Sequence, residues 1–385
     1  MFHEIRANVL ALALSVLLLN VLGVVMLFST GVFSAGADPG DLYFDGKRQV
    51  LWLALGVPLG IYAALIDLEW PRRFAGIVLA VAVVLLLLCF VPGIGREING
   101  ERRWVNLGGR FQPSEFAKPV LALALAAWYG RVRNGSFSFG RSVLVPLGIA
   151  AAVLVPVALE VDIGTTGVLA AMTFAMFLAA GVERRWLTAG ALGAVGAFAA
   201  LVILVPGRMD RVWAVIHPEA HAQGVGLQQR IAEIALGSGG LHGMGLGAGR
   251  MKMLYMPFAH TDFVFPMIGE ELGLGGTLLV LAGFAVFALA GLGIAQSAPD
   301  RFSQVFAVGL TVMVSGQAVL NIAVTTGVFP NTGIPLPFVS YGGSSLLASL
   351  VAAGLLVNLA RRQTRATVEA QPWWHQDPES QPNRL

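Results

Sequence analysis

Long apolar runs, separated by short polar segments, recur along almost the whole chain. A helix needs about 20 mostly apolar residues to cross the ~30 Å hydrocarbon core of a bilayer. Ten runs approach this length, and we predict a membrane-spanning helix in each. They are approximately 8–33, 49–66, 74–91, 113–128, 143–159, 165–181, 187–205, 272–295, 304–325 and 335–359. The pattern therefore predicts an all-α polytopic membrane protein of about ten transmembrane helices.

Basic residues are distributed unevenly between the two ends of these predicted helices. With the N-terminus inside, inner segments carry clusters such as Arg361 and Arg362, whereas the short outer loops carry only Lys47 and Arg48. Because cytoplasmic loops are enriched in lysine and arginine, both termini are predicted to be cytoplasmic. A large outer loop then joins helices seven and eight. We predict one transmembrane domain over residues 1–362 and a disordered cytoplasmic tail over 363–385.

Composition supports a membrane protein and excludes several other classes. Of the 385 residues, 56% are hydrophobic and 12% are charged, against about 25% charged in a globular chain. The polar surface is too small for a soluble enzyme of this size. The single cysteine, Cys89, excludes an internal disulfide and a cysteine zinc cluster. The net charge of +3 is too small to indicate nucleic-acid binding.

Two outer segments, 92–118 and 206–262, carry more basic residues than the charge rule predicts. Long translocated loops are partly exempt from that rule, so tolerance is one explanation. The other is that these cations hold an anion at the outer face. Arg102 and Arg103 beside Trp104 suit a phosphate, because guanidinium is a forked donor, but they also suit an interfacial anchor.

Acidic residues cluster near the start of the eighth predicted span. Asp262 and Glu270 are eight residues apart, so on one continuous helix they would share a face. Acids in or near a membrane usually line a wet cavity and mark function. Asp262 could equally cap the helix N-terminus, and the two roles are compatible.

Three further stretches combine polar residues with helix ends. Glu115 and Lys118 are three residues apart and can pair on one helical face, either structurally or functionally. Glu160 and Asp162 lie on a very short outer turn, where they could be helix caps. Prolines and glycines in 333–345 predict irregular backbone, which is tolerated at membrane depth where it is buried in protein or lines a cavity. A kink with small-residue packing is the alternative.

Together these stretches resemble the SEDS family, the FtsW, RodA and SpoVE proteins of cell-wall synthesis, over roughly residues 8–360. The matching motifs follow the family's order and spacing. They are Arg103-Trp104, Gln112-Pro113-Ser114-Glu115 with Lys118, Asp162-Ile163-Gly164-Thr165, Gly237-Ser238-Gly239-Gly240, His260-Thr261-Asp262-Phe263, Glu270-Glu271-Leu272-Gly273 and the run 335–345. Gly245-Leu246-Gly247 and Ser344-Ser345 are closer to the FtsW branch than to RodA.

The chain departs from the family pattern at three places. Phe258 replaces an acid, Ile231-Ala232 replaces Gln-Ser, and Val161 stands where proline is usual. These changes affect local loop contacts and leave Asp262, Glu270 and Lys118 in place.

The resemblance implies a peptidoglycan glycosyltransferase that polymerises lipid II into glycan strands at the outer face of the cytoplasmic (inner) membrane, for cell division or cell shape. Asp262 is the expected catalytic base. A divalent cation, Mg²⁺ or Mn²⁺, could share the stabilisation of the leaving diphosphate, held by Asp262 or Glu270; base and metal ligand both stay open for Asp262. The expected substrate-binding residues are Arg102, Arg103, Trp104, Gln112, Glu115, Lys118, Asp162, Gln228, Lys252, His260, Glu270, Ser340 and Tyr341.

The expected partners are lipid II, the nascent glycan strand, membrane lipid and a class B penicillin-binding protein, which is a transpeptidase. Two alternatives are a lipid II flippase and a non-catalytic scaffold for a transpeptidase. A flippase would be expected to carry charges near the bilayer midplane. Charged residues here crowd the outer face instead, which favours chemistry at that face.

Overall fold

The computed structural model describes residues 2–30, 43–98, 101–106, 110–132, 139–205, 207–220, 224–252 and 261–369. Most of these residues are helical, and one small antiparallel sheet interrupts the helices. The elements in chain order are α1 Phe2–Thr30, α2 Phe44–Leu65, α3 Glu69–Arg73, α4 Ala75–Leu88, β1 Gly95–Ile98, β2 Glu101–Asn106, β3 Arg110–Phe111, α5 Pro113–Tyr129, α6 Val145–Leu159, α7 Ile163–Ala179, α8 Arg184–Leu204, α9 Arg208–Ile216, α10 Leu227–Gly239, α11 Val264–Gln296, α12 Arg301–Thr325 and α13 Gly343–Glu369.

Every one of the ten predicted spans overlaps an apolar helix, and the polytopic helical fold is confirmed. Among the described residues, seven helices are long and apolar enough to cross a membrane by themselves. The count of ten is therefore not confirmed, because α4, α5 and α7 are each 17 residues or shorter. The last predicted span also starts too early, since 335–342 is irregular and α13 begins at Gly343.

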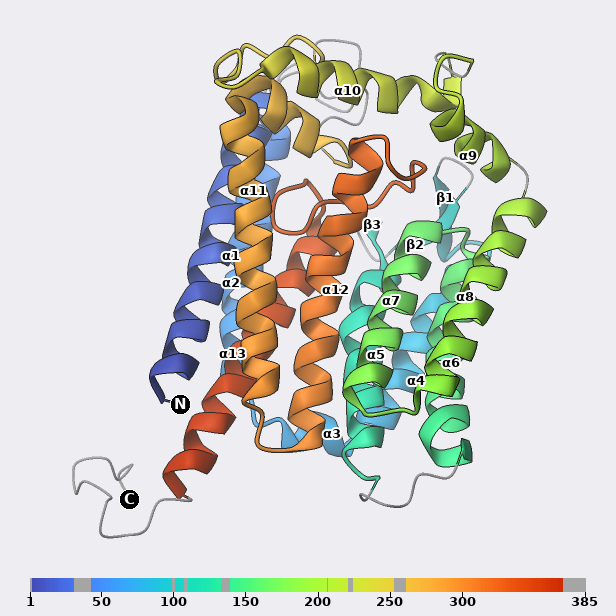
Figure 1. The fold of residues 1–385 in the computed structure, drawn as a ribbon, viewed down its shortest axis with the longest axis vertical. Coiled ribbons are helices and arrows are strands. Elements are labelled where there is room, and N and C mark those ends of the chain that lie inside the picture. Colours follow the sequence, from blue (N-terminus) through green and yellow to red (C-terminus); the bar gives the residue numbers. More distant parts are fainter. Residues whose placement is uncertain are drawn as a thin grey trace.

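The helices form a bundle with α12 inside it, packed against α5, α7 and α11 (Figure 1). Alongside, α2 packs on α13 and α1 on α11. Glycine permits the closest of these approaches, because a Cβ on Gly354 of α13 would collide with the carbonyl oxygen of Gly60 on α2. In contrast, α8 is mostly exposed along its length, as expected for a helix that faces lipid.

The two ends of the bundle differ in structure. In Figure 1, α1 begins and α13 ends at the lower end, which agrees with termini on one side of a membrane. The opposite, outer end carries α9, α10 and the sheet. Helix α13 continues to Glu369, so the predicted tail boundary at 363 is too early; residues 370–385 lie outside the described part.

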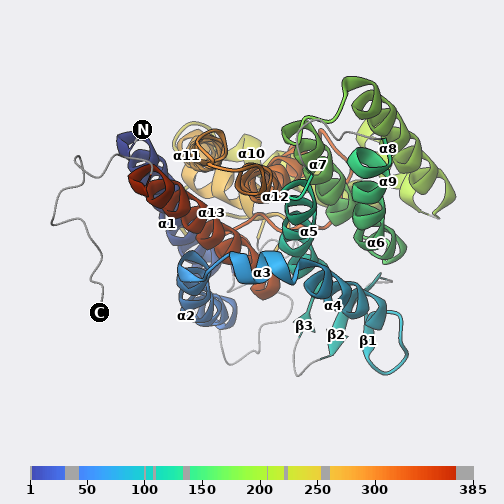
Figure 2. The same ribbon diagram turned by 90° about the horizontal axis from the view of Figure 1, so that it is seen from below.

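The basic segment 92–118 folds in a way that the all-α prediction did not include. It contains the three-stranded antiparallel sheet β1-β2-β3, with Arg96 paired to Trp104 and Val105 to Phe111. Figure 2 shows the sheet beside α4, at the margin of the bundle. Side chains alternate along a strand, so Arg103 and Val105 share one face of β2 and Arg102 and Trp104 the other. Val105 is buried, which identifies the inward face.

Candidate functional site

Asp262 lies at the outer end of the bundle, in the turn that precedes α11, and its side chain is partly exposed. The turn is fixed by Asn321 of α12, whose Nδ2 donates to the carbonyl oxygens of Asp262 and Ile334, each at 2.8 Å. One buried amide thus ties this turn to the irregular segment 330–342. Because α11 begins only at Val264, the prediction that Asp262 and Glu270 share one helical face is wrong.

Arg103 approaches the same place from β2. A Cβ built on Gly333 would lie 3.5 Å from Oδ2 of Asp262 and 3.8 Å from Nη2 of Arg103. The carboxylate and the guanidinium therefore border one small volume, which the absence of a side chain at Gly333 keeps open. Gly333 has φ +65°, a conformation that also favours glycine.

Asp162 supports Arg103 from behind. Its Oδ2 lies 3.6 Å from Nη1 of Arg103, and its carboxylate is fully buried. Asp162 caps α7, accepting from the backbone N–H and the hydroxyl of Thr165, each at 2.9 Å. Gln112 Nε2 donates to it at 3.3 Å. Because these contacts fix the Asp162 carboxylate, Asp162 holds the Arg103 guanidinium in place. The structure thus shows Asp162 positioning Arg103, whereas the sequence predicted that Asp162 binds substrate.

We call Asp262, Arg103, Asp162, Gln112 and Gly333 the open cluster. Arg102 does not belong to it. Its Nε pairs with Oε2 of Glu97 at 3.0 Å, and both side chains are more than half exposed. Trp104 shares that face of β2. Strand alternation places Arg102 and Trp104 on the face of β2 opposite Arg103, so they lie outside the open cluster, and their role in substrate binding stays a prediction.

A second group of charges at the outer end is closed. Lys252 pairs with Glu271, and both side chains are almost completely buried. Ser29, near the end of α1, donates to the Glu271 carboxylate and accepts from Lys252 Nζ at 2.7 Å. Lys252 is thus a structural cation inside the protein, and the prediction that it binds substrate is not supported by its position.

Glu270 is also closed to solvent. It is completely buried, and Oε1 accepts from the backbone N–H groups of Arg250 at 2.7 Å and Met251 at 3.1 Å. A break in α11 at Gly273, with φ +67°, frees the carbonyls of Glu270 and Glu271 to accept from Met244 and Gly245. In this structure Glu270 fastens the 240–252 loop to α11, and its substrate and metal roles stay predictions that its burial does not favour. Lys252, Glu270, Glu271 and Ser29 form what we call the closed cluster.

Glu115 and Lys118 form a third buried pair, with Nζ 2.9 Å from Oε2. Lys118 also donates to Gln317, whose Nε2 donates to the carbonyl oxygen of Pro335 at 2.9 Å. Both charged side chains are about 1–2% exposed. Their burial favours the structural alternative, a link between α5, α12 and the 330–342 segment, and their contact with substrate stays a prediction.

The remaining predicted residues are scattered. Ser340 is buried and its hydroxyl accepts from the Leu336 N–H at 2.8 Å, which folds the turn before α13. Tyr341 follows it and is partly exposed. Gln228 accepts from Asn331 Nδ2 at 2.8 Å and so joins α10 to the 330–342 segment. His260 lies outside the described residues.

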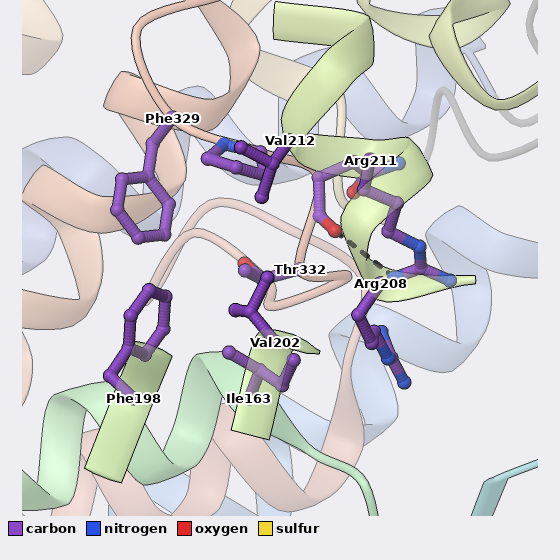
Figure 3. Close-up of a pocket in the computed structure, with 10 residues that line it drawn as sticks. Ile163, Phe198, Val202, Arg208, Arg211, Val212, Phe329 and Thr332 are labelled. Carbon is purple, nitrogen blue, oxygen red and sulfur yellow. Dashed lines mark hydrogen bonds between the residues drawn. The ribbon is translucent and has the colours of Figure 1, made fainter. Parts of the chain in front are cut away.

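A small, partly open pocket of about 20 Å³ lies between α7, α8, α9 and residues 329–332 (Figure 3). Its walls are largely apolar, with Phe198 and Phe329 on one side. Two arginines face it from α9. Arg208 Nη2 donates to the Val161 carbonyl at 2.9 Å, and Arg211 Nη1 donates to that of Asn331 at 3.0 Å. Two residues that line it are chain neighbours of the open cluster: Ile163 directly follows Asp162, and Thr332 directly precedes Gly333.

The same side chains decide how a metal ion could be held. In the described part of the chain, no group of three or more histidine, cysteine, aspartate or glutamate side chains is arranged around a metal position. The Glu270 carboxylate already accepts hydrogen bonds from backbone N–H groups. Of the two acids predicted to hold a metal ion, Asp262 is therefore the one that borders the space beside Gly333. Mg²⁺ is often bound by one carboxylate together with substrate phosphates, and Asp262 alone fits that mode.

The structure adds residues that the sequence reasoning missed. Asn321 and Gln317 lie four residues apart on α12, on one helical face, and each fastens the 330–342 segment. Their signal in the sequence is polarity inside an apolar span, since a polar side chain in a membrane helix needs a partner within the protein. Gly333 could not be identified in this way, because its importance depends on what approaches it.

Comparison with known proteins gives one consistent result. Residues 10–365 match the model of the FtsW/RodA/SpoVE family, described as "Cell cycle protein". The chain is 36% identical to a probable peptidoglycan glycosyltransferase FtsW of Trichlorobacter lovleyi, covering 91% of this chain and 92% of the relative. It is also 36% identical to stage V sporulation protein E of Bacillus subtilis, with 91% and 96% covered.

Solved structures agree with these sequence matches. A chain from work titled "Structural coordination of polymerization and crosslinking by a peptidoglycan synthase complex" aligns with a TM-score of 0.75 and 30% identity, covering 91% of this chain and 97% of that one. The rod shape determining protein RodA of Thermus thermophilus aligns with a TM-score of 0.66 and 29% identity, covering 91% and 96%. The predicted SEDS resemblance is thereby confirmed.

Proposed function

The chain belongs to the FtsW/RodA/SpoVE family and is a multi-pass peptidoglycan glycosyltransferase, and we propose that it polymerises lipid II at the outer face of the cytoplasmic membrane. The observation that carries this proposal is the open cluster. A partly exposed acid, Asp262, and a guanidinium, Arg103, border one volume at the outer end of the bundle. Base and cation are the two groups that glycosyl transfer from a diphosphate requires.

Asp262 acts as the general base in this proposal. The 4-hydroxyl of the incoming sugar attacks the anomeric carbon of the growing chain, and Asp262 takes the hydroxyl proton. The new carbon–oxygen bond forms with inversion, from α to β. The bond between the anomeric carbon and the diphosphate oxygen breaks, and its electron pair leaves with the polyprenyl diphosphate.

Arg103 stabilises the departing diphosphate. Charge develops on the phosphate oxygens as the bond breaks, and a fixed donor aimed there lowers the barrier. Asp162 holds one edge of the guanidinium, so the other edge is presented toward Gly333 without reorganisation. A divalent cation held by Asp262 and the substrate phosphates would supply further neutralisation of the same charge when bound.

The test is polymerisation of lipid II by the purified full chain with its transpeptidase partner. We expect Asp262→Asn to lower the rate by about 10²–10⁴-fold, the usual contribution of a positioned base. Asp210→Asn is the matched control, because Asp210 is an exposed aspartate on α9 at the same end. Unchanged polymer output from Asp262→Asn would exclude the base role.

The same variant separates the two alternative functions. A flippase predicts that Asp262→Asn stops movement of lipid II between leaflets in proteoliposomes. A scaffold predicts that the variant is harmless, whereas surface changes on α11 and α12 disturb the partner. Lost polymer with intact lipid movement supports the glycosyltransferase.

We also propose a class B penicillin-binding protein as the partner, since the similar solved chain comes from a complex that couples polymerisation to crosslinking. Co-purification from native membranes, followed by identification of the bound transpeptidase, tests this. It also distinguishes a role in division from one in cell shape.

A further inference from the structure

One buried acid has no role in the site as described so far. Glu160 lies in the three-residue turn between α6 and α7, two residues before Asp162. Its side chain is about 1% exposed, and among the described residues neither carboxyl oxygen has an N–H or O–H group as a hydrogen-bond partner; the Cys89 thiol, a weak donor, is the group that acts on it. A buried polar group without such a partner is costly, so its retention calls for an explanation.

The turn holds Glu160 rigidly. The Glu160 N–H donates to the Pro156 carbonyl at 3.0 Å, and the Ile163 N–H donates to that of Val161 at 3.1 Å. Val161 has φ +63°, a conformation that a β-branched residue rarely adopts. Arg208 of α9 fastens the Val161 carbonyl from outside. The backbone that carries Glu160 is therefore held in place on both sides of the residue.

Three titratable or charged side chains face Glu160 from the elements around it. The Cys89 thiol lies at the end of α4, Asp162 lies on the same turn, and Arg103 reaches in from β2. Burial is the largest cause that raises the pKa of Glu160, and the Asp162 charge raises it as well, whereas Cys89 and Arg103 lower it; the resulting pKa is about 8. Glu160 is thus mostly protonated at neutral pH.

We propose that Glu160 is a positioning residue for Arg103: as a neutral acid on the turn that carries Asp162, it leaves the guanidinium directed toward Asp262, and loss of its proton draws the guanidinium inward. The inference rests on the proposed function, because Arg103 is there the group that steadies the leaving diphosphate. The coupling is reciprocal, since an arginine that stabilises the Glu160 anion is itself attracted by that anion.

The proton on Glu160 also has a consequence for stability. The carboxyl has an ordinary pKa of 4.5 and a folded pKa of about 8. Between these values the folded chain binds one proton more than the unfolded chain, so this group lowers stability as the pH rises through that window. Glu160→Gln stays neutral at every pH and removes this dependence.

The first experiment reads the proton directly, in the full chain with its partner. Infrared difference spectra of wild type between pH 7 and pH 9 are expected to show loss of a protonated-carboxyl band, and Glu160→Gln is expected to lack that change. Glu97→Gln is the matched control, because Glu97 is an exposed glutamate of the nearby sheet. This readout needs no enzymatic activity, so it separates failure of this inference from failure of the proposed function.

The second experiment is the pH profile of polymerisation. From pH 7 to about pH 9 the wild-type rate is expected to fall about tenfold beyond any change in Glu160→Gln, whose profile stays flat within about twofold on that side. Melting temperatures of both proteins check that folding is retained. An identical alkaline decline in wild type and Glu160→Gln, or a carboxyl band that survives in Glu160→Gln, would overturn the inference.

Discussion

The open and closed clusters place the same kinds of side chain at the same end of the bundle and use them differently. In the open cluster, Asp262 is partly exposed and the Arg103 side chain is 17% exposed. In the closed cluster, the side chains of Lys252 and Glu271 are 1% and 0% exposed. Both contain an acidic and a basic side chain near a break in the helices. The difference lies in what covers them.

The closed cluster satisfies every group from within the protein. Backbone N–H groups of the 240–252 loop fill the carboxylates of Glu270 and Glu271, and Ser29 completes the pair with Lys252. Such a cluster fastens a loop to α11, and its donors and acceptors are already used by hydrogen bonds within the protein. In the open cluster, Asp162 pairs with Arg103 on the inner side, and Asp262 and Arg103 border the space beside Gly333 on the other. Charge at a membrane edge therefore indicates a site only where the protein leaves one side uncovered.

The largest expected effect comes from breaking the closed cluster. Lys252→Met leaves Glu271 buried without its cation, which should cost about 3–5 kcal/mol of stability. Thermal or urea unfolding in detergent measures this. The double variant with Glu271→Gln removes the stranded charge and should recover at least half of the loss. Equal stability of Lys252→Met and wild type would show that the pair is not structural.

Removing the cation of the open cluster should instead affect catalysis. Arg103→Ala is expected to lower the polymerisation rate by about 10²–10³-fold, the usual cost of losing one fixed donor to a developing anion. Its neighbour gives the control: Arg102→Ala breaks an exposed pair with Glu97 and should stay within about threefold of wild type. Equal losses in the two variants would contradict the assignment of opposite strand faces.

A smaller effect is expected from filling the open volume. Gly333→Ala places a methyl group between the Asp262 carboxylate and the Arg103 guanidinium, and we expect about a tenfold lower rate from the displaced substrate. The left-handed backbone adds about 1–2 kcal/mol of strain. Gly207→Ala carries similar backbone strain, at φ +75°, with nothing near its Cβ, and controls for it. If both variants lose the same activity, strain alone explains the result.

The sequence predicted the helical membrane fold and the acid at the centre of the site, because each follows from local properties. Apolar runs of sufficient length predict helices, and Asp262 belongs to a motif that matches the family. Arg103 was also predicted, but together with Arg102. Only the strand geometry of β2 separates them, and the mixed apolar and charged residues of 92–118 gave no clear period of two.

The sequence could not show which charged residues are covered. Lys118, Lys252 and Glu270 were all expected at the substrate, yet each is buried by segments distant in sequence: Gln317 of α12, Ser29 of α1 and the 240–252 loop. The prediction that Asp262 and Glu270 share one helical face was wrong because α11 begins after Asp262. Burial depends on tertiary packing, and no local pattern reports it.

The most direct measurement compares Asp262→Asn with Glu270→Gln, as polymerisation rate per folded molecule and as melting temperature in the same preparations. Asp262→Asn is expected to keep the wild-type melting temperature and lose the reaction. Glu270→Gln, in which backbone donors lose their charged acceptor, is expected to melt earlier and to retain most of its rate per folded molecule. An active Asp262→Asn, or a stable and inactive Glu270→Gln, would contradict the division into open and closed clusters.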